Sequence, residues 1–185
     1  MQKYKNIIII IATIVIIILV RFTGIYNAVL KQFYPKKYSE YVEKYSAEYN
    51  VDPLLVYSII KAESNFKKDA ISSSGAKGLM QLMNSTATEI ANEINEEYSE
   101  GDLQDIEKNI MLGTKYYSDL EQKYSGNMLL ALAAYNAGIG NVTQWIAADI
   151  IKEDGSDIEN IPFKETNMYV RKIVNNYKMY QKLYR

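Results

Sequence analysis

The sequence predicts an all-α domain that follows an N-terminal membrane-spanning helix. Apolar residues recur at spacings of three and four in several segments between residues 38 and 184, as they do on the buried face of a helix. Glycine and proline stand at the ends of these segments, and no segment alternates convincingly as a half-buried strand does. With 185 residues, 48% of them hydrophobic and 23% charged, the chain suits one packed domain plus an appendage.

The appendage contains an unbroken apolar run, Ile7–Val20. A helix that crosses a bilayer needs roughly 20 residues, so we predict a span over about residues 7–26, with Arg21 reaching to the interface. The bulky residues after the run offer no cleavage site, which favours an uncleaved signal-anchor over a removed signal peptide or a buried core helix. Residues 1–37 would then be the anchor and its connector, and residues 38–185 the folded domain.

Two helices are predicted at the start of this domain. The first carries one apolar face made by Tyr38, Tyr41, Val42, Tyr45 and Tyr49. The second begins at Asp52-Pro53, because aspartate is a good N-cap and proline fits the first helical position. Residues 54–60 are apolar on more than one side, which predicts a central helix. Glu63 lies at its C-terminal end, where the helix dipole and the apolar neighbours both raise a carboxyl pKa.

The remaining elements alternate with polar or glycine-containing segments. Residues 72–78 have the composition of a loop. Thr86 and Glu89 suggest a capping box for a helix that runs to about Ile94, and a surface loop follows over 95–102. We then predict a helix from about 106 that ends at Gly126, a helix over 128–136 stopped by Gly138 and Gly140, a helix over 142–150, a loop over 152–160 and a last helix. This last helix carries Val170, Ile173, Val174, Tyr177 and Tyr184 on one face.

Missing residue types exclude several classes of chemistry. The chain contains no histidine, so it has neither a Ser-His-Asp triad nor an HExxH zinc site. It contains no cysteine, so it has no disulfide and no thiolate metal site. Acid–base catalysis would therefore depend on carboxylates, lysine or tyrosine. The net charge of -1 gives no electrostatic reason to expect nucleic-acid binding.

Four short motifs occur in a fixed order along the domain. They are Ala62-Glu63-Ser64-Asn65-Phe66, the glycine-rich stretch Ser74–Met83, Ala133-Ala134-Tyr135-Asn136-Ala137-Gly138, and Pro162–Val170. Each motif is weak alone, but together they resemble the lytic transglycosylases of bacterial cell walls, in particular the soluble-type (SLT) catalytic domain with its goose-type lysozyme-like fold. The resemblance covers about residues 49–180.

The resemblance implies roles for nine residues. Glu63 matches the catalytic glutamate of the family, and the substrate-binding residues would be Ser72, Ser74, Gln81, Met83, Tyr135, Asn136, Glu165 and Tyr169. Several have structural alternatives: Tyr135 could be a core tyrosine, Asn136 a helix-terminating residue, and Glu165 a favourable partner of a helix dipole. Asn84 stands where the family often has proline, which affects a helix start and not the chemistry. No metal or cofactor is implied.

The expected activity is cleavage of the β-1,4 bond between N-acetylmuramic acid and N-acetylglucosamine in peptidoglycan, with 1,6-anhydromuramyl ends as products. The alternatives are a hydrolytic muramidase on the same fold and a non-catalytic peptidoglycan-binding or assembly component. Lysine and arginine flank the apolar run on both sides, so charge does not fix its orientation. Because the expected substrate is extracytoplasmic, we place the domain outside the cell membrane, anchored by a single pass or, as the alternative, secreted.

Overall fold

The computed structural model describes residue 5, residue 13, residue 21 and residues 24–185. Most of the membrane span predicted over residues 7–26 therefore lies outside the described residues. No helix within the described part of the chain is both long enough and apolar enough to cross a membrane.

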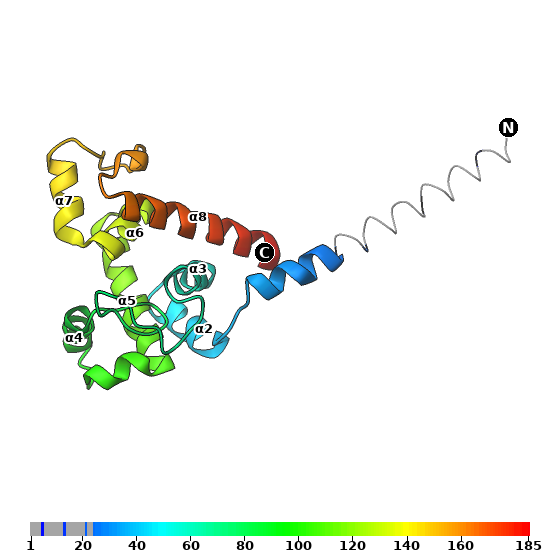
Figure 1. The fold of residues 1–185 in the computed structure, drawn as a ribbon, viewed down its shortest axis with the longest axis horizontal. Helices are drawn as coiled ribbons and strands as arrows, with labels where there is room; N and C mark the ends of the chain where they lie inside the picture. The colour runs from blue at the N-terminus through cyan, green and yellow to red at the C-terminus, as the bar shows by residue number, and fades with distance from the viewer. Residues whose placement is uncertain (1–4, 6–12, 14–20, 22–23) are drawn as a thin grey trace.

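The described chain folds into helices joined by loops (Figure 1). A helical segment over residues 24–33 comes first. The other elements are α2 (Ser39–Glu48), α3 (Pro53–Glu63), α4 (Asn84–Glu93), the 3₁₀ turn η1 (Glu100–Gln104), α5 (Ile106–Lys123), α6 (Met128–Ala137), α7 (Ile139–Ala147), the 3₁₀ turn η2 (Ile158–Asn160) and α8 (Lys164–Tyr184). Between residues 24 and 185 there is no strand, only isolated bridges that join Lys77 to Ile71 and to Leu82. The all-α prediction is confirmed.

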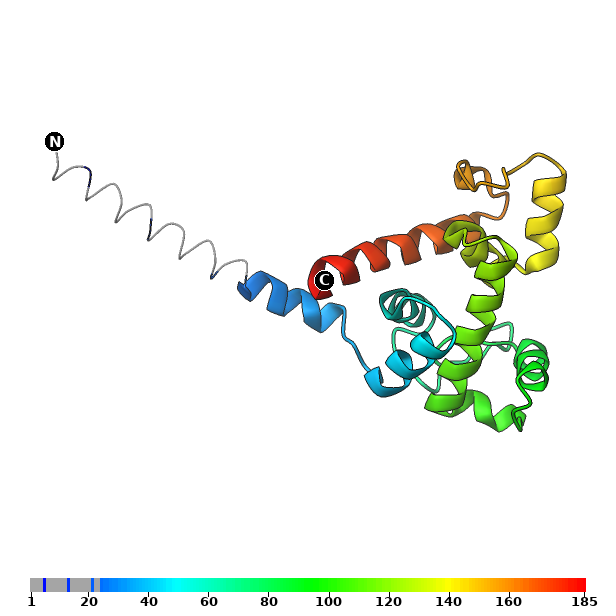
Figure 2. The ribbon, with the colours of Figure 1, turned by 180° about the vertical axis from the view of Figure 1, so that it is seen from behind.

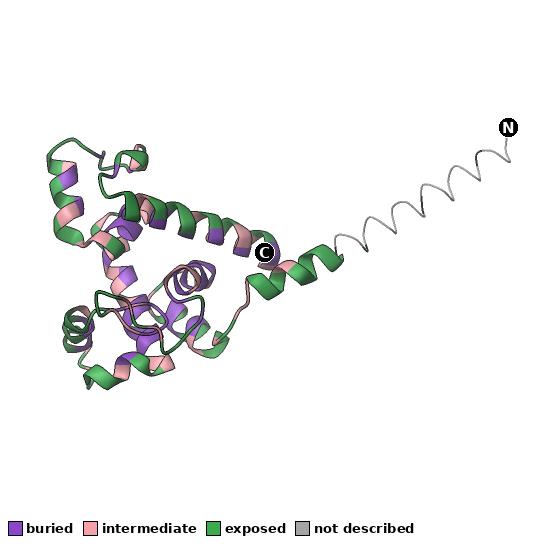
Figure 3. Ribbon diagram, viewed as in Figure 1, coloured by how far each residue is buried: buried purple, intermediate pink, exposed green. Residues whose placement is uncertain are grey.

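The centre of the fold is α3, as its all-round apolar sequence predicts. Residues 54–60 are all buried, and Val56, Tyr57, Ile59 and Ile60 have no exposed surface (Figure 3). Helix α3 packs against α2 and against the long α8, while α5 contacts α2, α4 and α6. This arrangement brings the C-terminal end of α3 beside the first turns of α8, so an early helix and the last helix of the domain meet at Glu63.

Predicted helix ends are correct where a single residue governs the backbone. The Asp52 carboxylate accepts a hydrogen bond of 2.9 Å from the Leu54 amide at the start of α3, ahead of Pro53 at the first helical position. Gly138 ends α6 with φ of 86°, a conformation that L side chains rarely adopt. The same glycine is the N-cap of α7, so a new helix begins directly at Ile139.

Three local predictions were wrong. The capping box of Thr86 and Glu89 does not form, because α4 begins at Asn84 directly after the extended Met83. Gly140 does not stop a helix but lies inside α7, which begins three residues before the predicted start. The loop predicted over 95–102 runs into η1 from Glu100, where Ser99 and Asp102 form a capping box. The third miss had a local signal, because the capping box of Ser99 and Asp102 spans only four residues.

The connector expected before residue 38 is partly helical and is fixed to the domain. Residues 24–33 continue as helix, and the chain then turns through Tyr34 and Pro35. The hydroxyl of Tyr184 donates to the carbonyl of Tyr34 at 2.8 Å, and the hydroxyl of Tyr180 donates to the carbonyl of Pro35 at 2.9 Å. The start of the described chain is thus joined to the C-terminal end of α8 (Figures 1 and 2).

Candidate active site

Glu63 is the last residue of α3 and is only partly exposed. Its Oε1 accepts a hydrogen bond of 2.6 Å from the hydroxyl of Tyr169 on α8. Burial raises the pKa of Glu63 from 4.5 to about 7, and the Tyr169 hydrogen bond and the charge of Lys172 oppose this rise without cancelling it. A carboxyl group with this pKa holds its proton in a substantial fraction of molecules at neutral pH, so Glu63 can donate a proton there.

Two tyrosines stand beside this carboxyl group. Tyr169 is buried. Tyr135, near the end of α6, donates a hydrogen bond from its hydroxyl to the Met80 carbonyl at 2.8 Å. The ring of Tyr116 on α5 packs against Tyr135 with ring centroids 5.1 Å apart. Burial holds the pKa of the Tyr135 and Tyr169 hydroxyls well above the ordinary value, with the Glu63 charge acting in the same direction. Both hydroxyls are therefore neutral hydrogen-bond donors at neutral pH.

The segment from Ala70 to Met83 forms a tight loop that faces Glu63. Ser72 closes a turn, because its side-chain oxygen accepts from the Ala76 amide at 3.0 Å and its backbone carbonyl from the Gly75 amide at 3.0 Å. Gln81 has φ of 49°, and its side-chain amide donates to the carbonyls of Ala70 at 3.0 Å and Gly78 at 2.8 Å. The NH₂ group of Gln81 thus stabilises the loop.

Asn109 on α5 fixes this loop to the rest of the domain. It is buried, and its side-chain oxygen accepts from the Met80 amide at 2.8 Å. Its NH₂ group donates to the carbonyls of Lys77 at 3.1 Å and Leu103 at 2.9 Å. Gly78 has φ of +80° and lies so close to Asn109 and Leu103 that a Cβ atom would overlap both. Glycine is therefore required at this point for close approach as well as for backbone conformation.

The predicted site residues gather around two adjoining hollows. The first has a volume of about 280 Å³, and the second, of about 450 Å³, shares Glu63, Asn136 and Glu165 with it. Eight of the nine predicted residues line the first hollow, and they are Glu63, Ser72, Ser74, Gln81, Met83, Tyr135, Asn136 and Glu165. The ninth, Tyr169, lines the second hollow.

Asn136 and Glu165 form the side of the hollows opposite the loop. The hydroxyl of Thr166 donates to the side-chain oxygen of Asn136 at 2.7 Å, which joins the end of α6 to the start of α8. Asn136 therefore has a structural contact, and it is also an exposed residue that lines both hollows. Glu165 is exposed and lines both hollows.

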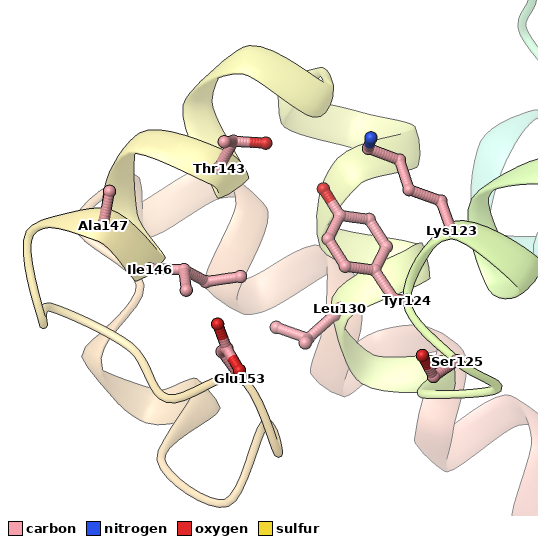
Figure 4. Close-up of a pocket in the computed structure, with 8 residues that line it drawn as sticks. All are labelled: Lys123, Tyr124, Ser125, Leu130, Thr143, Ile146, Ala147 and Glu153. Atoms are coloured by element: carbon pink, nitrogen blue, oxygen red, sulfur yellow. The ribbon is translucent and has the colours of Figure 1, made fainter.

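A larger hollow of about 510 Å³ lies between the C-terminal end of α5 and α7 (Figure 4). Lys123 and Tyr124 stand on one side of it, Thr143 and Ile146 on the other, and Glu153 comes from the loop after α7. The carboxylate that lines this hollow is that of Glu153, which is an exposed residue. Proton donation at neutral pH requires a carboxyl group with a raised pKa, and Glu63 meets this requirement. We therefore place the candidate active site at Glu63 and not in the larger hollow.

Three residues near Glu63 were not anticipated from the sequence. Tyr116 supports Tyr135, Asn109 holds the loop, and Lys172 donates to the Ala62 carbonyl at 2.6 Å while it lines the second hollow. Lys172 follows Tyr169 by three residues, so helical spacing would have placed it on the same side of α8. No short-range signal identifies Asn109 or Tyr116. Within the described chain, no group of three or more aspartate or glutamate side chains is arranged to hold a metal ion.

The family model for the transglycosylase SLT domain matches residues 40–158, which is more than half of the chain. The chain belongs to the transglycosylase SLT domain family. Within this family, the soluble lytic murein transglycosylase of Escherichia coli (strain K12) is 33% identical over 148 residues, which cover 78% of this chain and 23% of that protein. The membrane-bound lytic murein transglycosylase C of Edwardsiella ictaluri is 31% identical over 169 residues, or 80% of this chain and 47% of that protein.

Solved structures of the SLT family have the same fold. The 70 kDa soluble lytic transglycosylase of Escherichia coli superimposes with a TM-score of 0.75 at 30% sequence identity, covering 83% of this chain and 25% of that one. A complex of the 70 kDa soluble lytic transglycosylase with bulgecin A superimposes with a TM-score of 0.76 at 31% identity. This chain thus spans about a quarter of the soluble relatives and about half of the membrane-bound one.

Proposed function

We propose that this protein is a peptidoglycan lytic transglycosylase, which cleaves the β-1,4 bond between N-acetylmuramic acid and N-acetylglucosamine and leaves 1,6-anhydromuramyl ends. The observation that carries the proposal is Glu63, a carboxyl group with a pKa of about 7 where the two hollows of an SLT domain meet. Membership of the family supports the reaction class. The relatives named as murein transglycosylases are longer than this chain, so the activity of the whole protein is part of the proposal.

In the proposed mechanism, protonated Glu63 first acts as general acid. It donates its proton to the glycosidic oxygen while the bond from that oxygen to C1 of the muramic acid breaks. The N-acetyl group of the same sugar stabilises the positive charge at C1, in the place of a second protein carboxylate. Glu63 is now ionised and removes the proton from the C6 hydroxyl, whose oxygen bonds to C1. The internal hydroxyl is already close to C1, so it competes effectively with water, and no water is consumed.

The residues around Glu63 orient it and bind the sugar. Tyr169 engages Oε1 of Glu63, which holds the carboxyl group in one orientation and leaves its second oxygen for the substrate. We assign the loop side of the first hollow, with Ser72, Ser74, Gln81 and Met83, to substrate binding. Tyr135, Asn136 and Glu165 would bind from the other side. Glu165 is assigned to binding and not to a second catalytic role.

The position of Glu165 nevertheless supports a second candidate, a hydrolytic muramidase. A hydrolase of this type pairs its acid with a carboxylate that activates water, and Glu165 lines the same hollows as Glu63. In that mechanism water attacks C1 in place of the C6 hydroxyl. The two products then differ in mass by one water, so they are separable by mass spectrometry.

Location is part of the same proposal. Residues 1–37 would anchor the protein in the cell membrane, and residues 38–185 would form the catalytic domain on the extracytoplasmic side. The apolar run Ile7–Val20 supports the anchor, and so does the similarity to a relative that is named as membrane-bound. Secretion after cleavage of the segment is the alternative.

The test is mass spectrometry of the muropeptides that the protein releases from purified peptidoglycan. Anhydromuramyl products are expected from the parent protein, and Glu63→Gln should release them at least about 100-fold more slowly. Glu165→Gln is the matched carboxylate control, and it should still make anhydro products, with weaker binding. Reducing-end products that disappear in Glu165→Gln would favour the muramidase. Retained glycan binding with no product from the parent protein would favour a non-catalytic role.

A further inference from the structure

The helix over residues 24–33 has an apolar side that the domain does not cover. Ile25, Val29 and Phe33 follow one another at intervals of four residues, so they share one face of the helix. Their exposed fractions are 66%, 47% and 62%, and Tyr26 beside them is 48% exposed (Figure 3). Large apolar side chains gathered on one exposed helix face mark an interaction surface.

Basic residues surround this apolar face. From Gly24 to Ser39 and from Thr166 to Arg185 the sequence contains no acidic residue. The Lys31 amine lies 4.9 Å from the ring centroid of Tyr184, and the Lys182 amine lies 5.8 Å from that of Tyr26. Side chains of the helix over 24–33 and of the C-terminal end of α8 are therefore in contact. Within the described residues Lys36 and Arg185 form ion pairs with Glu43 and Asp52, whereas Lys31, Lys37 and Lys182 form none.

Acidic residues gather at the other end of the molecule. Glu89 and Glu93 lie on α4, and Glu96, Glu97, Glu100 and Asp102 follow up to η1. Helix α4 is far from the helix over 24–33 in both views of the fold (Figures 1 and 2). Lys77, Lys108 and Lys115 form ion pairs with four of these six carboxylates, so this end is net acidic with the lysines counted, and the first end is basic. An anionic surface would attract the first end and repel the second.

The basic end is held in a fixed position on the domain. Besides the hydrogen bonds from Tyr180 and Tyr184, the amine of Lys61 donates to the Phe33 carbonyl at 2.5 Å. The rings of Tyr34 and Tyr180 meet edge to face with centroids 5.6 Å apart. The helix over 24–33 therefore leaves the domain beside the C-terminal end of α8 in a defined direction.

We propose that the helix over 24–33 and the C-terminal end of α8 together form a surface that lies on an anionic lipid bilayer. The apolar face would enter the headgroup region, and the lysines would contact anionic lipid headgroups. Continuity with the apolar run Ile7–Val20 brings this surface to the membrane, so the inference rests on the proposed anchor. A second copy that docked through the same surface is disfavoured as the occupant, because it would bring further cations against these.

This surface would set the position of the active site. Tyr169, the partner of Glu63, precedes Tyr184 by fifteen residues of α8, which corresponds to about 22 Å of helix. The catalytic carboxyl group would therefore be held away from the bilayer, at the end of α8 remote from the lipid. Glycan strands would be cut at a fixed distance from the membrane, and not throughout the range of a flexible tether.

The absence of cysteine permits a direct test with the full chain. A fluorophore would be attached to a single introduced cysteine, either Phe33→Cys or Gln181→Cys. Each labelled protein would be placed in vesicles of phosphatidylcholine with and without phosphatidylglycerol. Quenching by nitroxide-labelled lipid is expected at both positions with phosphatidylglycerol, and it should weaken at high salt. The dependence on phosphatidylglycerol decides the test, because the anchor alone holds Tyr26 and the adjacent end of α8 near lipid of any charge. Thr88→Cys on α4 is the control that should stay unquenched.

Charge variants test the chemistry of the surface. One lysine near an anionic bilayer changes binding roughly fivefold, so Lys31→Gln, Lys37→Gln and Lys182→Gln together should lower the docked-to-free ratio by about 100-fold. The matched control replaces three exposed lysines elsewhere, Lys123→Gln, Lys152→Gln and Lys164→Gln, and should leave quenching unchanged.

The possible failures are distinguishable. A chain that floats with the vesicles while quenching at Gln181 is the same with and without phosphatidylglycerol overturns the docking and leaves the anchor standing. A chain that does not float overturns both the anchor and the docking. Cross-linking of Val29→Cys between copies, with no lipid quenching, would assign the face to a second copy. Release of anhydromuropeptides is measured separately, so loss of docking is not confused with loss of the proposed activity.

Discussion

Replacing Glu63 with glutamine should stabilise the protein at pH 8 and have little effect at pH 4. The substitution keeps the size of the side chain and the oxygen that accepts from Tyr169, but it removes the ionisable group. Burial of the Glu63 carboxyl group raises its pKa, which means that the folded protein disfavours its ionised form. The folded state therefore loses stability when this group ionises, and the variant is spared this loss.

The size of the effect follows from the interval between two pKa values. In the unfolded chain Glu63 ionises near its ordinary value of 4.5, and in the folded protein near 7. Below 4.5 the group is protonated in both states and contributes nothing. Between the two values only the unfolded chain has lost its proton, so the free energy of unfolding falls as the pH rises. An interval of about 2.5 pH units corresponds to about 3 kcal/mol, lost completely above pH 7.

Urea unfolding of the parent protein and of Glu63→Gln in the same detergent measures this difference. We expect the variant to be about 3 kcal/mol more stable at pH 8 and within about 0.5 kcal/mol of the parent at pH 4. Glu165→Gln, at an exposed carboxylate of the same hollows, is the matched control for replacing a carboxylate by an amide. An equal stability difference for Glu63→Gln at the two pH values would refute the argument, because it would show that ionisation of this group costs the folded state nothing.

Three further outcomes are expected. Tyr169→Phe removes a hydrogen bond that lowers the pKa of Glu63, so the upper pH limit of anhydromuropeptide release should rise by about one pH unit; an unmoved limit in an active variant would contradict this. Gly78→Ala should destabilise the fold by about 3 kcal/mol or more, because the new Cβ overlaps its neighbours, whereas Gly75→Ala, with space around it, should cost about 1–2 kcal/mol in thermal or urea unfolding. A fragment of residues 38–185 should be about 1–3 kcal/mol less stable than the full chain, because it lacks the Tyr34 and Pro35 carbonyl groups that accept from the hydroxyls of Tyr184 and Tyr180. Equal unfolding midpoints for the fragment and the full chain would show that these hydrogen bonds contribute little.

Much of the fold was predictable because the signals that start, stop and orient a helix lie within a few residues of one another in the sequence. Apolar periodicity, the Asp52-Pro53 start and the helix stop at Gly138 each act within a few residues of chain, and the structure agrees with all three. Helix starts at Asn84 and Ile139 were not predictable in this way. They depend on how a loop or a preceding helix end is packed, and no short window of sequence contains that information.

The sequence by itself excluded chemistry that needs histidine or cysteine, and it predicted that Glu63 ends a buried helix with a raised pKa. This was possible because residue types, their order and the direction of each helix follow from the sequence without knowledge of tertiary contacts. Tertiary structure alone decided which groups meet this carboxyl group. The Tyr169 hydroxyl reaches it across 106 residues of chain, and Asn109 fixes a loop from another helix. Contacts of this kind depend on how helices pack, because side chains far apart in sequence become neighbours only when their helices share a core.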